Sequence, residues 1–292
     1  MKIINITQKE YRDIDALSNS DLQLIEVSPS NYKFAINAPQ DTSKTSALDY
    51  GTALHAALLE PETFNSLVDV YSDTKTRETV KFSKYMDERE DDGKLVLLES
   101  EYDKLRFTVE GSQYHPQFAS YINSATHKEA SITCMYRGVM CKVRPDAMNI
   151  HFSDDGMGDL DSLLNWVADV KTTADIDDWR NSAEWKNPLF THNYGFTAAF
   201  YMDVLAEAFQ CEVNEYKFLV VQKTVNLGRY PVAVFTVTRD ELERYGFFER
   251  VHAAIDTYKA CYVSDNWMGE EVFPLFNDKF NSDVEISFGG DE

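Results

Sequence analysis

The sequence has few cysteines, few basic residues and no long apolar run. No stretch approaches the ~18–20 apolar residues that a membrane-spanning helix needs, and residues 1–13 lack the apolar segment of a signal peptide. The four cysteines are spread thinly without a CxxC pair, which disfavours a zinc ribbon or an iron–sulfur cluster. We therefore expect a cytoplasmic protein with reduced thiols and no membrane partner.

The scarcity of basic residues leaves the chain strongly acidic. Lys and Arg total 28 and Asp and Glu total 49, so the net charge is −21 at pH 7. Taken alone, this balance argues against a nucleic-acid-binding protein, because such proteins usually present a basic face. The length of 292 residues and the 43% of hydrophobic residues suit an ordinary globular protein with one large domain or two small ones.

The first part of the chain has the pattern of helices and loops. Residues 17–21, LSNSD, are typical of a helix N-terminus, with one of the Ser or Asn residues as the N-cap. Further helices are expected over 31–37, 49–60 and 99–110. Residues 73–94 carry dense charge of both signs, so we expect an exposed loop, a solvated helix or a mobile segment that contacts a substrate. We expect residues 1–125 to form a helical N-terminal portion packed on the core.

From residue 129 the pattern changes to strands that alternate with helices. Strands are expected over 129–136, 139–143, 166–170, 216–222 and 231–237, and helices over 184–209 and 239–262. This order predicts an α/β sandwich around a mixed sheet. Residues 126–264 would form the core, 265–292 an acidic tail that is partly ordered at most, and the whole chain one compact domain.

Two short motifs at strand ends carry the most chemical information. Asp146 follows Arg144 and Pro145 at the end of one expected strand, and Asp169 and Lys171 lie two apart at the end of the next. Side chains two apart on a strand share a face, and neighbouring strands lie ~4.8 Å apart, so the two carboxylates can meet. Close carboxylates need a cation between them, and oxygen ligands suit Mg²⁺. A lysine beside the metal could orient or deprotonate an attacking water.

A D-x-K tripeptide alone is commonly a surface ion pair, but P-D followed by D-x-K on β-rich segments predicts a PD-(D/E)xK nuclease centre. Two further residues fit such a centre. His55 lies among small and apolar residues, either as a core histidine or as a ligand of the metal or its water. Glu129 opens the first expected strand, either as a strand-edge charge or as a group that holds metal-bound water or a second cation.

Longer stretches in the same order are similar to the RecE exonuclease (exodeoxyribonuclease VIII) family, which belongs to the PD-(D/E)xK nucleases. The resemblance runs from about Leu17 to Tyr262, through LSNSDLQLIEVSPSNYKFAINAP, LDYGTALHAALLEPETF, EASI, KVRPDAM, VADVKTTADI and GRYPVAVF. It implies a restriction-endonuclease-like α/β core, with a mixed central sheet flanked by helices and a helical N-terminal extension. It also implies an Mg²⁺-dependent exonuclease, for which Mn²⁺ can substitute, that degrades one strand of double-stranded DNA from its 5′ end.

The same resemblance implies partners and site residues. Family members are bacterial or phage-encoded, leave 3′ overhangs for a RecT-type annealing protein in recombination, and form ring-shaped oligomers, a tetramer in RecE. Carried over by position, the family's active-site residues match His55, Glu129, Asp146, Asp169 and Lys171. The expected metal ligands are Asp146, Asp169 and the backbone carbonyl of Val170, with His55 and Glu129 contributing directly or through water.

One motif departs from the family pattern. The family carries Tyr-x-x-Gln on the helix after D-x-K, and here Tyr194 fits but Thr197 stands where Gln is expected. Threonine keeps a hydroxyl but lacks the amide's paired donor and acceptor. Water, Gln222 or Asn193 could replace the missing contact. We expect Tyr194 to take part in catalysis and, with Thr197, to contact DNA, so the departure bears on rate and end-binding more than on the reaction class.

The net charge of −21 repels DNA at long range, and two explanations reconcile it with a nuclease. In the first, basic residues concentrate on the DNA path and the acids face outward. The residues expected on that path are Lys75, Arg77, Lys81, Lys84, Lys142, Arg144 and Lys171. In the second, the protein works at high ionic strength, where an acidic surface aids solubility.

Three other functions remain open at this point. One is a RecB-like nuclease that cuts single strands or acts with a helicase. Another is a catalytically weak protein that binds DNA ends, impaired by Thr197. A third is an acidic DNA mimic that binds another protein.

Overall fold

A mixed five-stranded sheet forms the centre of the computed structural model, which describes residues 2–38, 46–89, 93–154 and 160–268. Its strands, in spatial order, are β10 (Val232–Thr238), β9 (Glu215–Gln222), β8 (Leu160–Thr173), β7 (Ala147–Asp154) and β4 (His127–Lys128). β8 pairs parallel with β9, and the other neighbours are antiparallel. The expected mixed central sheet is therefore confirmed.

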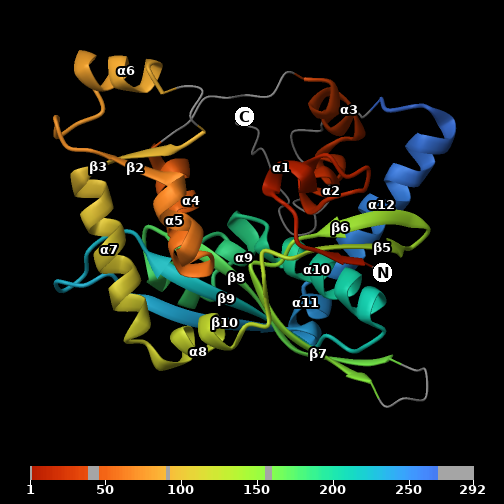
Figure 1. Cartoon of the computed structure of the whole chain (residues 1–292). Helices are drawn as coiled ribbons and strands as arrows, with labels where there is room; N and C mark the ends of the chain where they lie inside the picture. The colour runs from red at the N-terminus through yellow and green to blue at the C-terminus, as the bar shows by residue number, and fades with distance from the viewer. Residues whose placement is uncertain (1, 39–45, 90–92, 155–159, 269–292) are drawn as a thin grey trace, which may run out of the picture.

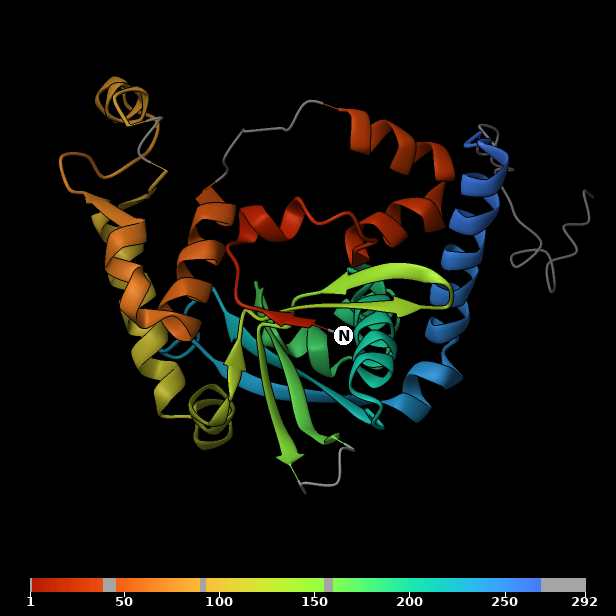
Figure 2. The same ribbon diagram turned by 45° about the vertical axis from the view of Figure 1, so that its right-hand side comes forward.

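Alternate residues of the central strands enter two separate hydrophobic cores. Val167 of β8 and Phe218 of β9 join the core that includes α10 (Tyr194–Phe209) and α12 (Phe247–Ser264). Ala168 and Val170 of β8 join the core on the opposite face, which includes α4 (Ser46–Leu59), α7 (Glu99–Gln113) and α8 (Pro116–Ser124). Strands that are apolar on both faces are typical of a sheet covered by helices on both sides. Figures 1 and 2 show these two helix groups on either side of the sheet.

A second sheet contains the expected hairpin. β5 (Ser131–Tyr136) and β6 (Val139–Val143) pair antiparallel, and β1 (Lys2–Ile4) adds to the free edge of β5. Arg137 and Gly138 form the turn, and both have positive φ angles, as a tight two-residue hairpin requires. The two hairpin strands lie apart from the five-stranded sheet, although the sequence suggested that β6 would neighbour the strand with Asp169.

The strand that neighbours β8 is instead β7, which the sequence analysis missed. Asp146 therefore lies just before a strand and not at the end of one. Glu129 likewise precedes its strand, since β5 begins at Ser131 and Glu129 has a left-handed backbone with φ of 50°. β8 is also longer than the expected strand over 166–170.

The N-terminal part contains eight helices among the described residues, together with short strands. Besides α4, α7 and α8, these helices are α1 (Gln8–Arg12), α2 (Asn19–Val27), α3 (Pro29–Asn37), α5 (Pro61–Leu67) and α6 (Val80–Asp87). Ser18 caps α2, as expected, and accepts a hydrogen bond from the backbone N–H of Asp21. β2 (Val68–Tyr71) and β3 (Leu95–Leu98) form a small parallel sheet that carries α6 at one end of the molecule (Figure 1).

Two expected helices are interrupted in the structure. Over 184–209, only α9 (Pro188–Thr191) and α10 are helical, and a short 3₁₀ helix, η2 (Ile176–Arg180), follows β8. The expected helix over 239–262 is two helices, α11 (Arg239–Arg244) and α12, because Gly246 between them adopts φ of 72°. Most of the expected acidic tail, residues 269–292, lies outside the described residues. Within the described ranges, the helices are too short or too polar to span a bilayer.

Candidate active site

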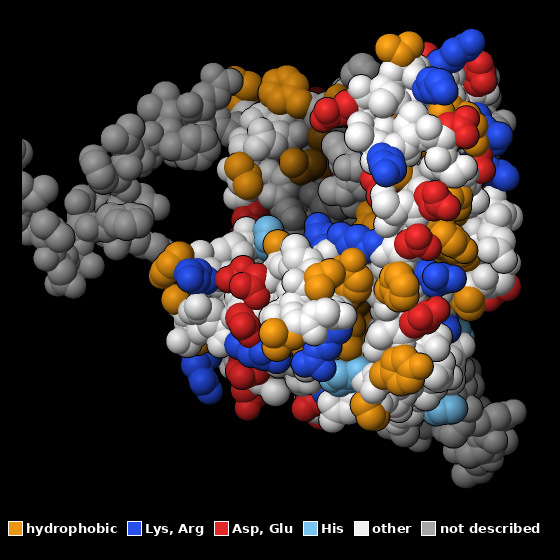
Figure 3. Space-filling model, turned by 90° about the vertical axis from the view of Figure 1, so that its left-hand side faces the viewer, with side chains coloured by type: hydrophobic (Ala, Val, Ile, Leu, Met, Phe, Trp, Pro, Cys, Tyr) orange, Lys and Arg blue, Asp and Glu red, His pale blue; other side chains and the backbone are white. Residues whose placement is uncertain are grey.

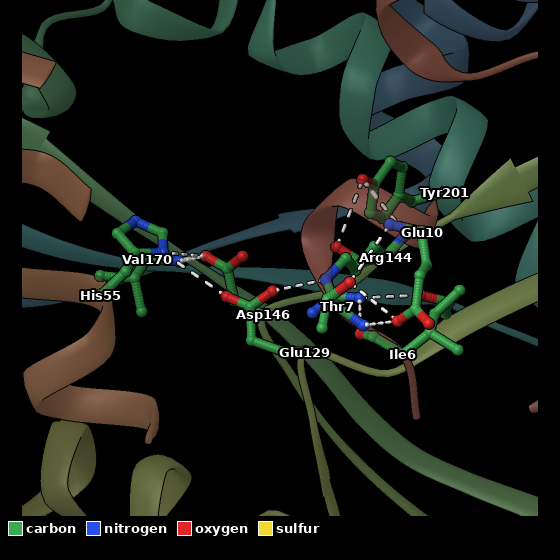
Figure 4. A network of polar contacts seen from close by, with 10 residues as sticks. Ile6, Thr7, Glu10, His55, Glu129, Arg144, Asp146, Val170 and Tyr201 are labelled. Atoms are coloured by element: carbon green, nitrogen blue, oxygen red, sulfur yellow. Dashed lines mark hydrogen bonds and ion pairs between the residues drawn. The ribbon is translucent and has the colours of Figure 1, made fainter. Parts of the chain in front are cut away.

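Three side chains from distant parts of the sequence converge at the edge of the central sheet. His55 projects from α4, Glu129 from the link between β4 and β5, and Asp146 from the residue before β7 (Figure 4). His55 Nδ1 lies 3.5 Å from Asp146 Oδ2 and 3.9 Å from Glu129 Oε1. One ligand atom from each residue falls within 4.8 Å of the other two, which is the spacing of a site that can hold a metal ion.

Backbone hydrogen bonds fix the Asp146 carboxylate and the backbone of Glu129. The N–H of Val170 donates to Asp146 Oδ2 at 2.6 Å, so the carboxylate is held against β8. The N–H of Glu129 donates to the carbonyl of Asp146 at 3.1 Å, which ties the β4–β5 link to the start of β7. The sequence analysis assigned the carbonyl of Val170 to the metal, and what the structure shows is a role for its N–H. Asp146 is only 8% exposed, so these bonds replace most of its contact with water.

Asp169 and Lys171 form an ion pair beside the cluster. Alternation along β8 places both on the face covered by α10, where the Lys171 ammonium lies 5.0 Å from the centre of the Tyr194 ring. Asp169 is buried and lies close enough to Asp146 to raise the pKa of that residue. The sheet thus brings Asp146, Asp169 and Lys171 together as expected, but through β7 and not through the hairpin.

Burial and the closeness of the carboxylates shift the pKa values of all three side chains of the cluster. Burial raises the pKa of Asp146 to about 7, and the neighbouring Asp169 adds to this effect. Burial alone would lower the pKa of His55, but Asp146 and Glu129 outweigh it and raise that pKa to about 9. Burial tends to raise the pKa of Glu129, yet hydrogen bonds from His55 and Arg144 bring it below its usual value.

Arg144 is engaged inside the protein, although the sequence analysis placed it on DNA. Its Nε donates to Glu129 Oε2 at 2.8 Å, and its Nη1 donates to the carbonyl of Ile6 at 2.8 Å and to Ser131 Oγ at 2.9 Å (Figure 4). The hydroxyl of Tyr201, a residue that the sequence analysis missed, lies 3.4 Å from both the N–H and the carbonyl of Arg144. Arg144 therefore orients the Glu129 carboxylate.

Of the other residues expected to contact DNA, some are engaged inside the protein and some are exposed. Arg77 is held within the N-terminal portion, because it pairs with Glu101 at 2.8 Å and donates to the carbonyl of Val96. Lys75, in the same segment between β2 and α6, is exposed. Lys142 is buried, and its ammonium donates to three carbonyl groups of residues 11–14.

Two amides of α2 meet Thr197, the residue that departs from the family motif. Asn19 Nδ2 and Gln23 Nε2 donate to the Thr197 hydroxyl at 3.1 Å and 3.2 Å. Gln222 is engaged elsewhere, with its amide oxygen on the N–H of Ile176. The sequence analysis suggested Gln222 or Asn193 as a replacement for the missing glutamine, but the amides that reach Thr197 come from α2. The sequence signal for Asn19 and Gln23 was their place in the LSNSDLQ stretch, which the resemblance to the RecE family includes.

A large cavity opens onto the cluster. Its volume is about 1640 Å³, and it lies between the N-terminal helices, α4 and the start of β7. His55, Glu129 and Asp146 are in its wall, together with Arg12 and Lys128. The three side chains are therefore accessible to a large molecule that enters the cavity.

The donor set suits a divalent cation. Two carboxylates and one imidazole converge, with a third carboxylate nearby, and oxygen-rich sets of this kind hold Mg²⁺ or Mn²⁺. The raised pKa of Asp146 supports the same conclusion, because a cation would relieve the repulsion between the buried carboxylates.

A helix-covered mixed sheet with clustered acids and a lysine at the ends of neighbouring strands defines a PD-(D/E)xK nuclease-type core. A family model described as "PDDEXK-like domain of unknown function (DUF3799)" matches residues 18–270, and the chain belongs to this family. The family confirms the PD-(D/E)xK superfamily and indicates a nuclease, without resolving the narrower RecE family. A search of curated proteins found no match.

Proposed function

We propose that this protein is a metal-dependent exodeoxyribonuclease that acts on double-stranded DNA ends in the 5′-to-3′ direction. The observation that carries the proposal is the convergence of His55, Glu129 and Asp146 next to the Asp169–Lys171 pair, at the wall of a large cavity. The direction, the duplex substrate and a role in recombination rest on the resemblance to the RecE family. By the same resemblance, the overhang would pass to a RecT-type annealing protein, and the chain would form a ring-shaped tetramer.

The residues at the site have distinct tasks in this proposal. His55, Glu129 and Asp146 would hold the divalent ion, which supplies charge neutralisation at the scissile phosphate. Asp169 fixes Lys171. Burial tends to lower the pKa of Lys171, but Asp169 and Asp146 raise it above its ordinary value, so the ammonium stays protonated and donates hydrogen bonds. Lys171 would thus bind a phosphate oxygen or orient water rather than take up a proton.

The test is a comparison of linear duplexes labelled at the 5′ or the 3′ end, with Mg²⁺, with Mn²⁺ and with a chelator. We expect the 5′ label to be released first as mononucleotides or short oligonucleotides, and only with the metal. Asp169→Asn and Lys171→Ala should abolish release, whereas Lys259→Gln, on the far helix α12, should not. Full activity in either site variant would overturn the assignment, and digestion of circular single strands would favour the RecB-like alternative.

A further inference from the structure

A cluster of three cations, none of which forms an ion pair among the described residues, lies around the connection that follows β9, the strand that pairs with the strand of Lys171. Lys223 and Arg229 belong to the connection between β9 and β10, and Lys104 projects from α7. Among the described residues, no carboxylate lies within 4.0 Å of any of the three charged groups, although the chain holds 49 acids and 28 bases. The carboxylate of Glu101 acts on Lys104 only from a longer distance. Three of the seven basic residues expected on the DNA path are, by contrast, engaged internally: Arg77 and Arg144 bind acids, and Lys142 binds carbonyls.

Within this cluster, the position of Lys104 is fixed by its contacts. The Lys104 ammonium lies 4.9 Å from the centre of the Tyr50 ring and 5.8 Å from that of Tyr230, so two aromatic rings hold it in place. Lys223 is close enough to lower the pKa of Lys104, an effect second only to burial. Two ammonium groups that face each other cost free energy, and an anion between them would remove that cost.

The cluster lies beside the cavity of the candidate active site and not in its wall. The N–H of Lys223 donates to the carbonyl of Thr173 at 2.8 Å, and Thr173 is two residues beyond Lys171 on β8. Thr172, between them, lines the large cavity, as do Gly51 and Thr52, which follow Tyr50 on α4. Figure 3 views the side on which the β9–β10 connection lies in Figure 1, and it shows Lys and Arg side chains gathered in and below a hollow of that face.

We propose that Lys104, Lys223 and Arg229 form a binding surface for the phosphate backbone of duplex DNA whose end lies at the candidate active site. This inference rests on the proposed function and names the path of its substrate. A duplex carries one phosphate per ~3.4 Å along each strand, so a duplex that reaches Lys171 has further phosphates over the neighbouring surface. On a chain with a net charge of −21, an unpaired cationic cluster at that place neutralises those phosphates where the rest of the surface would repel them.

The experiment measures binding of a short blunt duplex by fluorescence anisotropy across a salt series, with a chelator present so that no cleavage occurs. Lys223→Gln and Arg229→Gln should each weaken binding and lower the salt slope by about one, and the double variant by about two. Lys223→Arg keeps the positive charge and should keep the salt slope of the unsubstituted protein. Lys259→Gln makes the same change in net charge on α12 and should leave the slope as it is. Thermal unfolding of every variant checks that the fold is kept.

The outcomes separate this surface from the nuclease assignment. A double variant with the affinity and salt slope of the unsubstituted protein overturns the surface, even if Mg²⁺-dependent release from labelled duplex is intact. If the variants lose affinity as expected while no duplex is hydrolysed, the surface stands and the proposed nuclease activity falls. If Lys259→Gln lost as much affinity for the duplex, the effect would be one of net charge alone, and the proposed binding surface would be wrong.

Discussion

At the scale of single residues, the site depends on how Glu129 is held. Its carboxylate bridges His55 on one side and Arg144 on the other, and its backbone adopts φ of 50°. Arg144 presents its guanidinium to a carboxylate, a carbonyl and a hydroxyl at once, an arrangement that the planar fork of arginine can satisfy and a lysine cannot. Arg144 is therefore a positioning residue for the candidate metal site.

Arg144→Gln should weaken metal binding more than DNA binding. Partners that orient metal ligands typically contribute about 10-fold to 100-fold to metal affinity, so we expect a loss in that range for Mn²⁺ by calorimetry. Arg239→Gln is the matched control, because Arg239 also pairs with a carboxylate, that of Asp203. If Arg144 instead contacted DNA, the variant would keep its metal affinity and lose affinity for duplex.

Metal binding should strengthen as pH rises and should release protons. The pKa of Asp146 is raised to about 7 and that of His55 to about 9, so both groups carry protons at a pH below 7 that a bound cation must displace. Between about pH 7 and about pH 9 only the His55 proton remains in competition, and affinity should rise up to tenfold per pH unit. Calorimetry in buffers of different ionisation enthalpy measures the released protons. His55→Asn removes one of the two protons, but it also removes the positive charge that lowers the pKa of Asp146, so the Asp146 proton should then be released at higher pH than before. The variant should release at most the one proton of Asp146, and release of two protons would contradict the assignment of the groups.

At the scale of elements, the sequence indicates local features well and long-range partners poorly. The Ser18 cap and the Arg137-Gly138 turn depend on neighbours in sequence, and both are where the pattern placed them. β7 was missed although residues 148–153, MNIHFS, alternate between apolar and polar side chains, the pattern of a half-buried strand. That Arg144 would meet the carbonyl of Ile6 could not be predicted, because that contact depends on β1 adding to the edge of β5.

The contact between α10 and α12 should tolerate no side chain at Gly195. A Cβ atom there would lie 2.3 Å from the Phe247 ring, so Gly195→Ala must push the two helices apart. We expect a loss of about 1–3 kcal/mol in the free energy of unfolding, measured by denaturant titration. Gly51→Ala, in α4, is the control: its Cβ would meet nothing within 4 Å, and removal of a helical glycine should be neutral or stabilising by about 0.5–1 kcal/mol. Adding Phe247→Leu should recover part of the loss, and an undiminished loss in the double variant would contradict the clash.

At the scale of the whole molecule, the net negative charge repels a phosphate backbone at long range, and local groups of cations attract it at short range. Most of the described arginines are paired with acids. Some of the cations without an ion pair lie close to the site: Arg12 and Lys128 line the cavity, and Lys104 and Lys223 lie near the end of β9. From a distance, a phosphate backbone meets a net charge of −21. Only within about a Debye length does the local cationic surface dominate.

This arrangement predicts that the rate of association with duplex DNA passes through a maximum as salt is added. Raising the ionic strength from about 0.01 M to about 0.1 M shortens the Debye length from about 30 Å to about 10 Å, which removes the long-range repulsion and should speed association. Further salt weakens the phosphate contacts themselves and should slow it. Stopped-flow anisotropy with a chelator present measures the rate. The Lys223→Gln/Arg229→Gln double variant should keep the rise at low salt but lose much of the fall at high salt, because the rise comes from net charge and the fall from local contacts. A rate that only decreases with salt would show that the acidic surface does not oppose the approach of DNA.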